Sequence, residues 1–427
     1  MNSRKIGLLI INGPLPPPYG GIATYLAHAL PYLAKHEFEV HTITDQKPKD
    51  LQDHAVYVKE GVHIHYSKFT RVTKVLKAFK HIPFWISVVR NSHLPVLYLL
   101  KTMASMIGWI EAGESVLRTQ KIEIIHAYDY PWVQGYVALY LARKYGKKTV
   151  QSTFGEVVPH REELVQHDEL GKDYRPFVRY VLGQCDLIVT LSQHCARELE
   201  YVGAPQGSVR VTRYGVDTKS YKLGLDREKV RETHGFGNRP LVLFLGQIRP
   251  RKGPHILVQA IPHVLRKVKD ALVLFVGPDY QMVQSLKDLA RSMNVDQNVQ
   301  FLGPQPEELV PLFFSACDVF AFPSCTPIEC LGLSMVQAMA CGKPVVGSNI
   351  DGIPEVIVDG KTGFLVKPND PIDLGEKTAL LLKNRALGQR MGRAGNERVK
   401  KFFSREMLVR ELEGLYGALA QKPRQRA

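Results

Sequence analysis

The sequence lacks several features that would assign it to a familiar class of protein. No stretch of about 18 uncharged apolar residues occurs, because charged residues and a proline interrupt the longest apolar region, 82–110, so we expect no membrane-spanning helix. The six cysteines form no Cys-x-x-Cys pair, and so long a chain needs no disulfide framework, which favours buried thiols in a reducing cytosol. The apolar run 6–11 is too short for a signal peptide, and we expect a cytoplasmic protein.

Several catalytic and cofactor motifs are missing too. The first apolar run is not followed by Gly-x-Gly-x-x-Gly, which disfavours a nicotinamide-dependent dehydrogenase. Residues 360–362 resemble the end of a P-loop, but Glu355 stands where the upstream glycine is required. The spacing of His63 and His65 favours a half-exposed strand over a metal site. With no Asp-x-Asp in the chain, we expect neither a metal ion nor a bound cofactor.

The charge balance is basic, with 56 Lys and Arg against 41 Asp and Glu in 427 residues, a net charge of +15. This sign suits an anionic partner, which could be nucleic acid, a membrane surface or a phosphorylated substrate. No basic platform interleaved with aromatic residues occurs, so we expect no nucleic-acid partner.

Short runs rich in β-branched residues alternate with segments of helical periodicity, in two successive series. Buried strands are predicted at 6–11, 40–43, 122–126, 149–153 and 187–191, and again at 241–245, 271–276, 299–302, 319–322 and 344–347. Intervening segments such as 22–33 and 133–144 have helical spacing. This alternation predicts two doubly wound α/β domains with parallel sheets, which we place at 1–213 and 214–400. The last segment, 401–427, is expected to be a helix and a basic tail that pack back toward the first domain.

The second domain holds the strongest group of polar positions. A predicted strand is followed by a loop with one acidic residue, Glu329, and then by Gly332, which opens the next helix. A helix N-terminus offers unpaired N–H groups and partial positive charge, and a glycine there lets an anion approach the backbone closely. Gln337 follows the carboxylate by eight residues. The spacing alone fits an anion-binding loop or an ordinary strand–helix junction.

The run 323–346 strongly resembles the Glu-x7-Glu region of the family 4 retaining glycosyltransferases. Further segments resemble other motifs of that family in the same order: 18–23, 214–217, 245–253, 301–303, 351–357 and 359–366. The resemblance extends from residue 5 to about residue 400. It implies the GT-B fold, in which two Rossmann-like domains face each other across a cleft.

The resemblance also implies an activity: transfer of a sugar from a UDP- or GDP-linked donor to a hydroxyl of a glycan or lipid-linked acceptor. The donor-binding residues it implies are Arg249, Lys252, Gln305, Glu329, Gly332, Leu333, Ser334 and Gln337. Those implied for the acceptor side and its phosphate loop are Gly20, Gly21, Tyr128 and Asp129. Catalysis would rest on Glu329, His126 and Lys252, because cleavage of a sugar–diphosphate bond builds negative charge on the phosphate and positive charge on the sugar.

Departures from the family pattern leave alternatives open. Gln337 replaces the second glutamate, Gln247 replaces an arginine so that we expect Arg249 to reach the phosphate, and Tyr128 and Phe154 stand where histidines are common. An epimerase or phosphorylase of the same fold, or an inactive nucleotide-sugar-binding protein, therefore remain alternatives. His126 either orients the acceptor or is a structural residue at the end of a buried strand.

A basic amphipathic segment in the first domain suggests a membrane surface. Apolar residues between 72 and 79 follow a helical stripe, and basic residues accompany them at Arg71, Lys74, Lys77 and Lys80. Such a helix either lies on anionic lipid or packs on its own domain. In the family that the chain resembles, a basic helix of this domain frequently docks the enzyme beside a lipid-linked acceptor. This favours peripheral association with the inner face of a membrane, helped by aromatic residues in 82–86.

Overall fold

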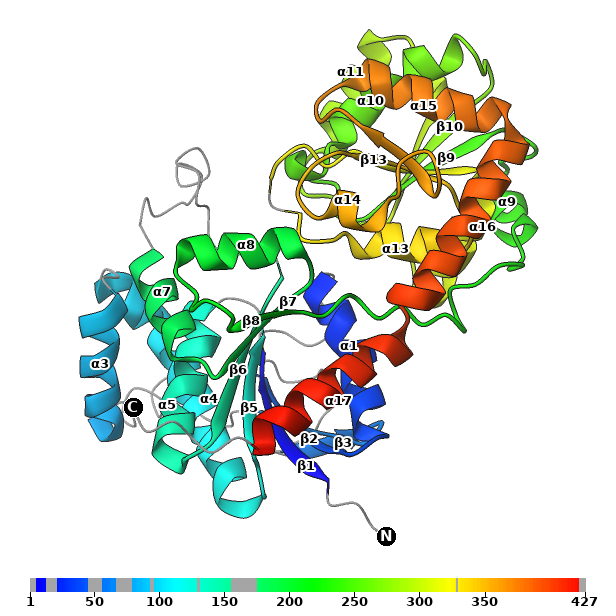
Figure 1. Ribbon diagram of the computed structural model, residues 1–427. Helices are drawn as coiled ribbons and strands as arrows, with labels where there is room; N and C mark the ends of the chain where they lie inside the picture. The colour runs from blue at the N-terminus through cyan, green and yellow to red at the C-terminus, as the bar shows by residue number, and fades with distance from the viewer. Residues whose placement is uncertain are drawn as a thin grey trace. The chain divides into compact units, whose positions relative to one another are not determined.

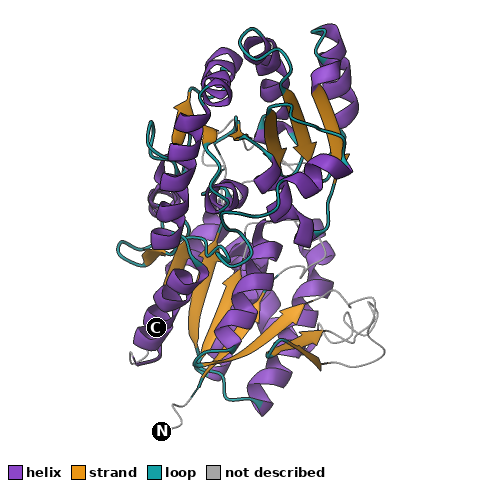
Figure 2. Ribbon diagram, turned by 90° about the vertical axis from the view of Figure 1, so that its right-hand side faces the viewer, coloured by secondary structure: helices purple, strands orange, loops and turns teal. Residues whose placement is uncertain are grey.

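The computed structural model describes residues 5–12, 21–44, 56–66, 79–92, 96–128, 131–154, 175–327 and 329–421. The chain divides into two compact units: unit 1 comprises 1–213 and 408–427, and unit 2 comprises 214–407. Both units are α/β, with helices on the two faces of each sheet (Figures 1 and 2). The prediction of two doubly wound units is confirmed.

Unit 1 is built on an eight-stranded sheet in the order β3-β4-β2-β1-β5-β6-β7-β8. Its strands are β1 (Ile6–Ile11), β2 (Phe38–Thr44), β3 (Val56–Lys59), β4 (Val62–Tyr66), β5 (Ile124–Tyr128), β6 (Lys148–Thr153), β7 (Leu187–Thr190) and β8 (Val209–Val211). All neighbours are parallel except β3 and β4. The turn of this hairpin, Glu60-Gly61, has φ of 50° and 82°, the positive values that a tight two-residue hairpin turn needs.

Helices from both ends of the chain cover this sheet. They are α1 (Gly21–Ala34), α3 (Ile82–Ser92), α4 (Val96–Thr119), α5 (Tyr136–Tyr145), α7 (Arg175–Gln184), α8 (Gln193–Val202) and, at the C-terminal end of the chain, α17 (Arg405–Gln421). A buried apolar cluster joins β1, β2 and β5 to α3, α4 and α5. The α17 side chain Tyr416 is fully buried, and its ring meets that of Phe38 edge-on at 5.5 Å, so the C-terminal helix is part of the core of unit 1.

Unit 2 has a fully parallel six-stranded sheet in the order β11-β10-β9-β12-β13-β14. Its strands are β9 (Leu241–Leu245), β10 (Leu272–Val276), β11 (Val299–Gly303), β12 (Val319–Phe322), β13 (Val345–Ser348) and β14 (Gly363–Val366). Its helices are α9 (Glu228–Thr233), α10 (Pro254–Leu265), α11 (Val283–Ser292), α12 (Val310–Ala316), α13 (Leu333–Ala340), α14 (Ile353–Val356), α15 (Pro371–Lys383) and α16 (Arg385–Phe402). Strands β10 and β11 follow on one side of β9, and β12 to β14 follow on its other side. The strand order therefore changes direction between β9 and β12, as in dinucleotide-binding sheets.

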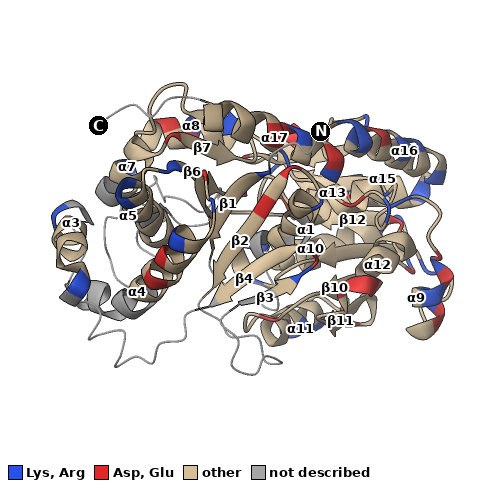
Figure 3. Cartoon of the chain, turned by 90° about the horizontal axis from the view of Figure 1, so that it is seen from below, with Lys and Arg blue, Asp and Glu red and all other residues tan. Residues whose placement is uncertain are grey.

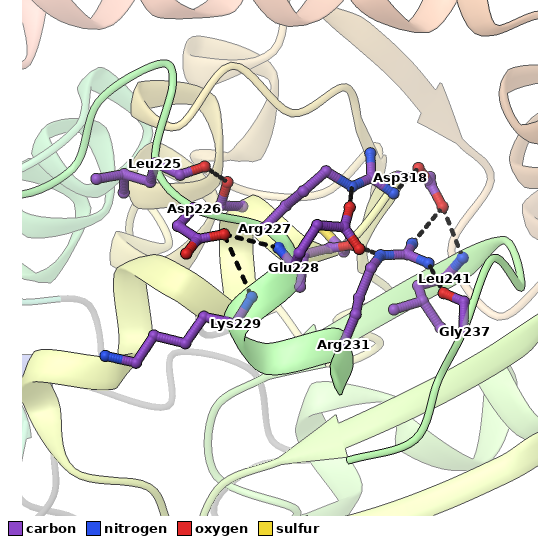
Figure 4. Close-up of polar contacts among 12 residues, drawn as sticks. Leu225, Asp226, Arg227, Glu228, Lys229, Arg231, Gly237, Leu241 and Asp318 are labelled. Atoms are coloured by element: carbon purple, nitrogen blue, oxygen red, sulfur yellow. Dashed lines mark hydrogen bonds and ion pairs between the residues drawn. The ribbon is translucent and has the colours of Figure 1, made fainter. Parts of the chain in front are cut away.

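A partly buried polar cluster joins the starts of these two central strands (Figure 4). The carboxylate of Asp318, just before β12, accepts hydrogen bonds from the backbone N–H of Leu241 at 2.8 Å and from Arg231 Nη2 at 3.0 Å. Arg231 lies in α9, is only 2% exposed, and also donates to the carbonyl oxygens of Ala316 and Gly237. The guanidinium thus links α9 to the chain just before β9 and just before β12, two strands that pair directly with each other.

We expect Arg231→Met to lower the free energy of unfolding by about 3–5 kcal/mol, because it removes the donor of the buried Ala316 carbonyl and the nearer of the two guanidinium partners of Asp318. Urea unfolding followed by circular dichroism measures this. The matched control is Arg291→Met, which removes an exposed ion pair to Asp288 in α11 and should change stability by no more than about 0.5 kcal/mol. Equal unfolding midpoints for the two variants would contradict the assigned role of Arg231.

Candidate functional site

The candidate site of unit 2 lies at the carboxyl ends of β9 and β12. Where the strand order of a doubly wound sheet changes direction, the connections that follow the two adjacent strands pass over opposite faces of the sheet. Ligands bind in the crevice between these two connections. The loop after β9 holds Lys252, and the loop after β12 holds Glu329. The sheet order therefore brings together two of the residues implied by the resemblance.

A close backbone approach holds these two loops together. Gly253 has φ of 66°, and a Cβ at this position would lie 1.9 Å from the carbonyl oxygen of Pro323. The backbone N–H of Cys325 donates to the carbonyl of Arg251 at 3.0 Å. A side chain at 253 would force the loops apart, so the glycine of the Lys-Gly pair is required by both conformation and space.

Lys252 and Glu329 form an ion pair across the two loops. Neither side chain is free in solvent, since 17% of Lys252 and 10% of Glu329 is exposed. Ser324 Oγ donates to the same carboxylate oxygen at 3.1 Å, and the ammonium group lies 5.4 Å from the ring centre of Phe322. The pair thus sits in a partly dry setting, where charge interactions are stronger than in water.

Opposing effects set the pKa of Glu329. Burial acts to raise it, but the positive charge and hydrogen bond of Lys252, the charge of Arg251 and the Ser324 hydrogen bond outweigh burial, so the pKa is lowered. Glu329 is therefore ionised at neutral pH. The carboxylate of Glu329 therefore lies beside the ammonium group of Lys252.

The backbone of Glu329 is held from the loop after β13. Its N–H donates to Asp351 Oδ2 at 2.9 Å, and its carbonyl accepts from the N–H of Gly352 at 3.2 Å. Asp351 has a positive φ of 51°, an uncommon conformation for a side-chain-bearing residue. The segment 351–357, which the resemblance picked out without a role, positions Glu329 through these contacts.

Helix α13 begins directly beside this carboxylate. Gly332 precedes it with φ of 85°, and a Cβ there would lie 2.9 Å from Cζ of Phe322. The N-cap residue Gly332 has no side chain to cap this helix N-terminus. Leu333 and Ser334 in the first turn are half-buried, so their backbone N–H groups lie where an anion would be stabilised by the helix dipole.

The remaining residues assigned to the donor have other neighbours. Arg249 stacks on Tyr280, with its guanidinium carbon 4.8 Å from the ring centre, and donates to Gln247 Oε1 at 3.3 Å, so it does not join the Lys252–Glu329 pair. Gln305 follows β11 and donates to the carbonyl of Leu302 at 2.9 Å. Gln337 is 7% exposed and lies in the second turn of α13.

In unit 1 the structure favours the structural interpretation of His126. It lies in β5 with no exposed surface, and both ring nitrogens have partners: Nδ1 contacts Tyr416 Oη at 2.7 Å and Nε2 contacts Ser152 Oγ at 2.8 Å. Tyr128 is also fully buried, stacked on His126 with ring centres 4.0 Å apart. Gly21 opens α1, whereas Gly20 and Asp129 lie outside the described residues.

Most of the proposed basic helix, including Arg71, Lys74 and Lys77, also lies outside the described residues. Lys80 is described and pairs with Glu111 at 3.4 Å. The expectation that aromatic residues of 82–86 face a membrane is wrong for Phe84, which is 2% exposed and belongs to the core of unit 1. None of the described helices combines the length and the apolar character needed to cross a bilayer.

Sequence comparisons identify the family. Residues 19–220 match the model described as Glycosyltransferase Family 4, and residues 226–398 match the model described as Glycosyl transferases group 1. The two matches together cover most of the chain, and the chain belongs to this family of glycosyltransferases, as the sequence resemblance predicted.

Two curated relatives illustrate the range of the family. A GDP-mannose-dependent alpha-(1-6)-phosphatidylinositol monomannoside mannosyltransferase of Mycolicibacterium smegmatis is 31% identical over 266 residues, which cover 60% of this chain and 66% of that protein. A D-inositol 3-phosphate glycosyltransferase of Nocardia farcinica is 32% identical over 222 residues, 50% of this chain and 49% of that protein. The chain thus spans 49% to 66% of the length of these relatives.

Solved structures establish the fold. The Anabaena protein HepE in complex with UDP matches with a TM-score of 0.73 at 17% identity, over 97% of this chain and 100% of that one. Sucrose-phosphate synthase from Thermosynechococcus elongatus matches with a TM-score of 0.76 at 20% identity, over 97% and 99% of the two chains. The fold is GT-B, as expected.

The burial of His126 predicts a pH dependence of stability. Burial lowers its pKa to about 3, whereas a histidine of the unfolded chain has a pKa of about 6.5. Between these values the unfolded state binds a proton that the folded state does not, so stability falls as the pH drops through this window, by up to about 1.4 kcal/mol per pH unit. We expect the loss of stability between pH 7 and pH 5, measured by urea unfolding, to be smaller in His126→Gln than in the unchanged chain. Identical losses in the two proteins would contradict this prediction.

Proposed function

We propose that this chain is a retaining glycosyltransferase that moves a sugar from a UDP- or GDP-linked donor to an acceptor hydroxyl. The observation that carries the proposal is the Lys252–Glu329 pair beside the N-terminus of α13, at the point of unit 2 where ligands of such sheets bind. Similar proteins support it, since one relative depends on GDP-mannose and a protein of similar fold forms a complex with UDP.

The paired charges match the charges that develop when a sugar–diphosphate bond breaks. The leaving diphosphate gains negative charge, which Lys252 and the N–H groups of Leu333 and Ser334 would stabilise. The anomeric carbon gains positive charge, which the ionised Glu329 would stabilise. In the donor complex Lys252 exchanges its carboxylate partner for phosphate, while Ser324 and the contacts of Asp351 keep Glu329 in place.

The same arrangement supports a reaction in which no metal ion bridges the diphosphate. A lysine, the neighbouring Arg251 and a helix N-terminus supply the positive charge that a divalent cation supplies elsewhere. We further propose that Gln337, buried in α13, contacts the donor through its amide, which can donate and accept hydrogen bonds.

We also propose that unit 1 docks on an anionic membrane to reach a lipid-linked acceptor. Helix α3 exposes an apolar stripe with Ile82 at 50%, Ile86 at 47% and Val89 at 56% exposure, at spacings of four and three residues. Basic residues lie at both ends of this helix, Lys80 just before it and Arg90 in its last turn (Figure 3). An apolar face flanked by cations suits a surface of anionic lipid. A relative that acts on a phosphatidylinositol mannoside supports this proposal.

The donor proposal predicts that Lys252→Met and Glu329→Gln reduce kcat/KM by about 100- to 1000-fold, because each removes a charge aimed at the transition state. The donor is first found by a thermal-shift screen of UDP- and GDP-sugars, in which a bound donor at about 100 times its Kd stabilises the protein by about 2.7 kcal/mol. The initial rates of the two variants and of the unchanged chain are then measured with that donor.

The matched control is Lys287→Met, which removes an exposed lysine of α11 and should leave the rate unchanged. We expect Lys252→Met to lose most of the donor-dependent thermal shift as well, because its ammonium binds phosphate in the ground state. A Glu329→Gln protein with undiminished turnover would remove this carboxylate from the mechanism.

The membrane proposal predicts that the chain sediments with vesicles containing phosphatidylserine, less at high salt, and only weakly with pure phosphatidylcholine vesicles. We expect the double variant Ile86→Asp and Val89→Asp to bind these vesicles at least about ten-fold more weakly, because each substitution removes an apolar side chain that would be buried in the lipid. Ile372→Asp, at an equally exposed position of α15 (53%), is the control and should bind like the unchanged chain. Binding that ignores both anionic lipid and salt would refute the proposal.

A further inference from the structure

Four polar side chains gather on one face of the sheet of unit 1, near its β3 edge. Glu39 and His41 are alternate residues of β2, and His63 and His65 are alternate residues of β4, so each pair shares one face of its strand. The two strands are parallel neighbours, with His41 opposite His63 and Ile43 opposite His65. Ile43 is on the same face of β2 as Glu39 and His41, and it belongs to the buried cluster that includes residues of α4. The group therefore lies on the face of the sheet that α4 covers.

The side chains of this group converge. His41 Nε2 lies 3.4 Å from Glu39 Oε1, and His41 Nδ1 lies 3.0 Å from His65 Nε2. The ring of His41 stacks on that of His63, with centres 4.7 Å apart. One potential ligand atom each from Glu39, His41 and His63 lies within 4.8 Å of the others. Ligands held at 2.0–2.1 Å around one tetrahedral ion are separated by roughly 3.4 Å, so small side-chain rotations bring these atoms to that spacing.

The buried surroundings of His41 and His65 suit metal binding. His41 is only 2% exposed, and burial followed by the neighbouring His63 lowers its pKa. Burial, His41 and His63 lower the pKa of His65 to about 4. Burial thus favours the neutral forms of His41 and His65, and a neutral imidazole offers the lone pair that a metal ion binds. The one carboxylate of the group, Glu39, supplies negative charge.

We propose that Glu39, His41 and His63 bind a transition-metal cation of the Zn²⁺ type, and that His65 orients His41 from its other ring nitrogen. Two imidazoles and a carboxylate form a ligand set that zinc accepts, and a metal-bound histidine ordinarily has a partner on its second nitrogen. The ion would link β2 to β4, and so fasten the edge of the sheet where β3 pairs with β4. This role is independent of glycosyl transfer.

The test is equilibrium dialysis of the full chain, without a tag and stripped by chelator, against Zn²⁺ at neutral pH, with bound metal measured by atomic absorption. We expect the unchanged chain to bind one equivalent more than His63→Gln and Glu39→Gln. His65→Gln should keep this equivalent with about 10- to 100-fold weaker affinity, since it alters only the partner of a ligand. Glu39 is 42% exposed, so its substitution tests the site without disturbing the core.

His36→Gln is the matched control, because His36 is a half-exposed histidine of the same unit that pairs with Glu413 outside the group. It should bind as much zinc as the unchanged chain, with equal affinity. An unchanged chain that binds no zinc at micromolar concentrations, or a His63→Gln protein that binds the same number of equivalents with the same affinity, would overturn the proposal.

Discussion

The ion pair of Lys252 and Glu329 joins two loops separated by 77 positions in the sequence, and the architecture of unit 2 serves to keep those loops in contact. At one end of the central strands, Asp318 and Arg231 tie β12 to the start of β9. At the other end, the missing side chain of Gly253 lets the lysine loop rest on the carbonyl of Pro323. The pair is therefore preorganised, so a ligand that takes the place of one partner meets the other already oriented.

The sequence predicted the strands of unit 2 closely, since runs such as 241–245 and 319–322 coincide with β9 and β12. Buried parallel strands are short, continuous apolar runs, and a breaker residue ends each of these two, Gly246 after β9 and Pro323 after β12. In unit 1 the run 122–126 proved to be β5, Ile124–Tyr128, two residues further on, because apolar periodicity does not mark where pairing begins.

The candidate site was predictable where motifs are local, as for Glu329 and Gly332, and was not where partners come from distant elements. No spacing in the sequence announces that Asp351 holds the backbone of Glu329, or that Tyr280 stacks with Arg249. The histidine group shows the same limit. The spacing of His63 and His65 indicated only a strand, and the neighbouring His41 becomes visible once the sheet order places β2 beside β4.

Helix α17 has a consequence for the order in which the protein can be made. Its Tyr416 completes the buried contacts of His126, yet residues 214–404 separate this helix from the rest of unit 1. On the ribosome, the first unit to be synthesised is therefore the last to be finished, because its core stays open until the C-terminal helix emerges. A fragment that ends after unit 2 would expose the aromatic surface of Phe38 that α17 covers, and it would be prone to aggregate.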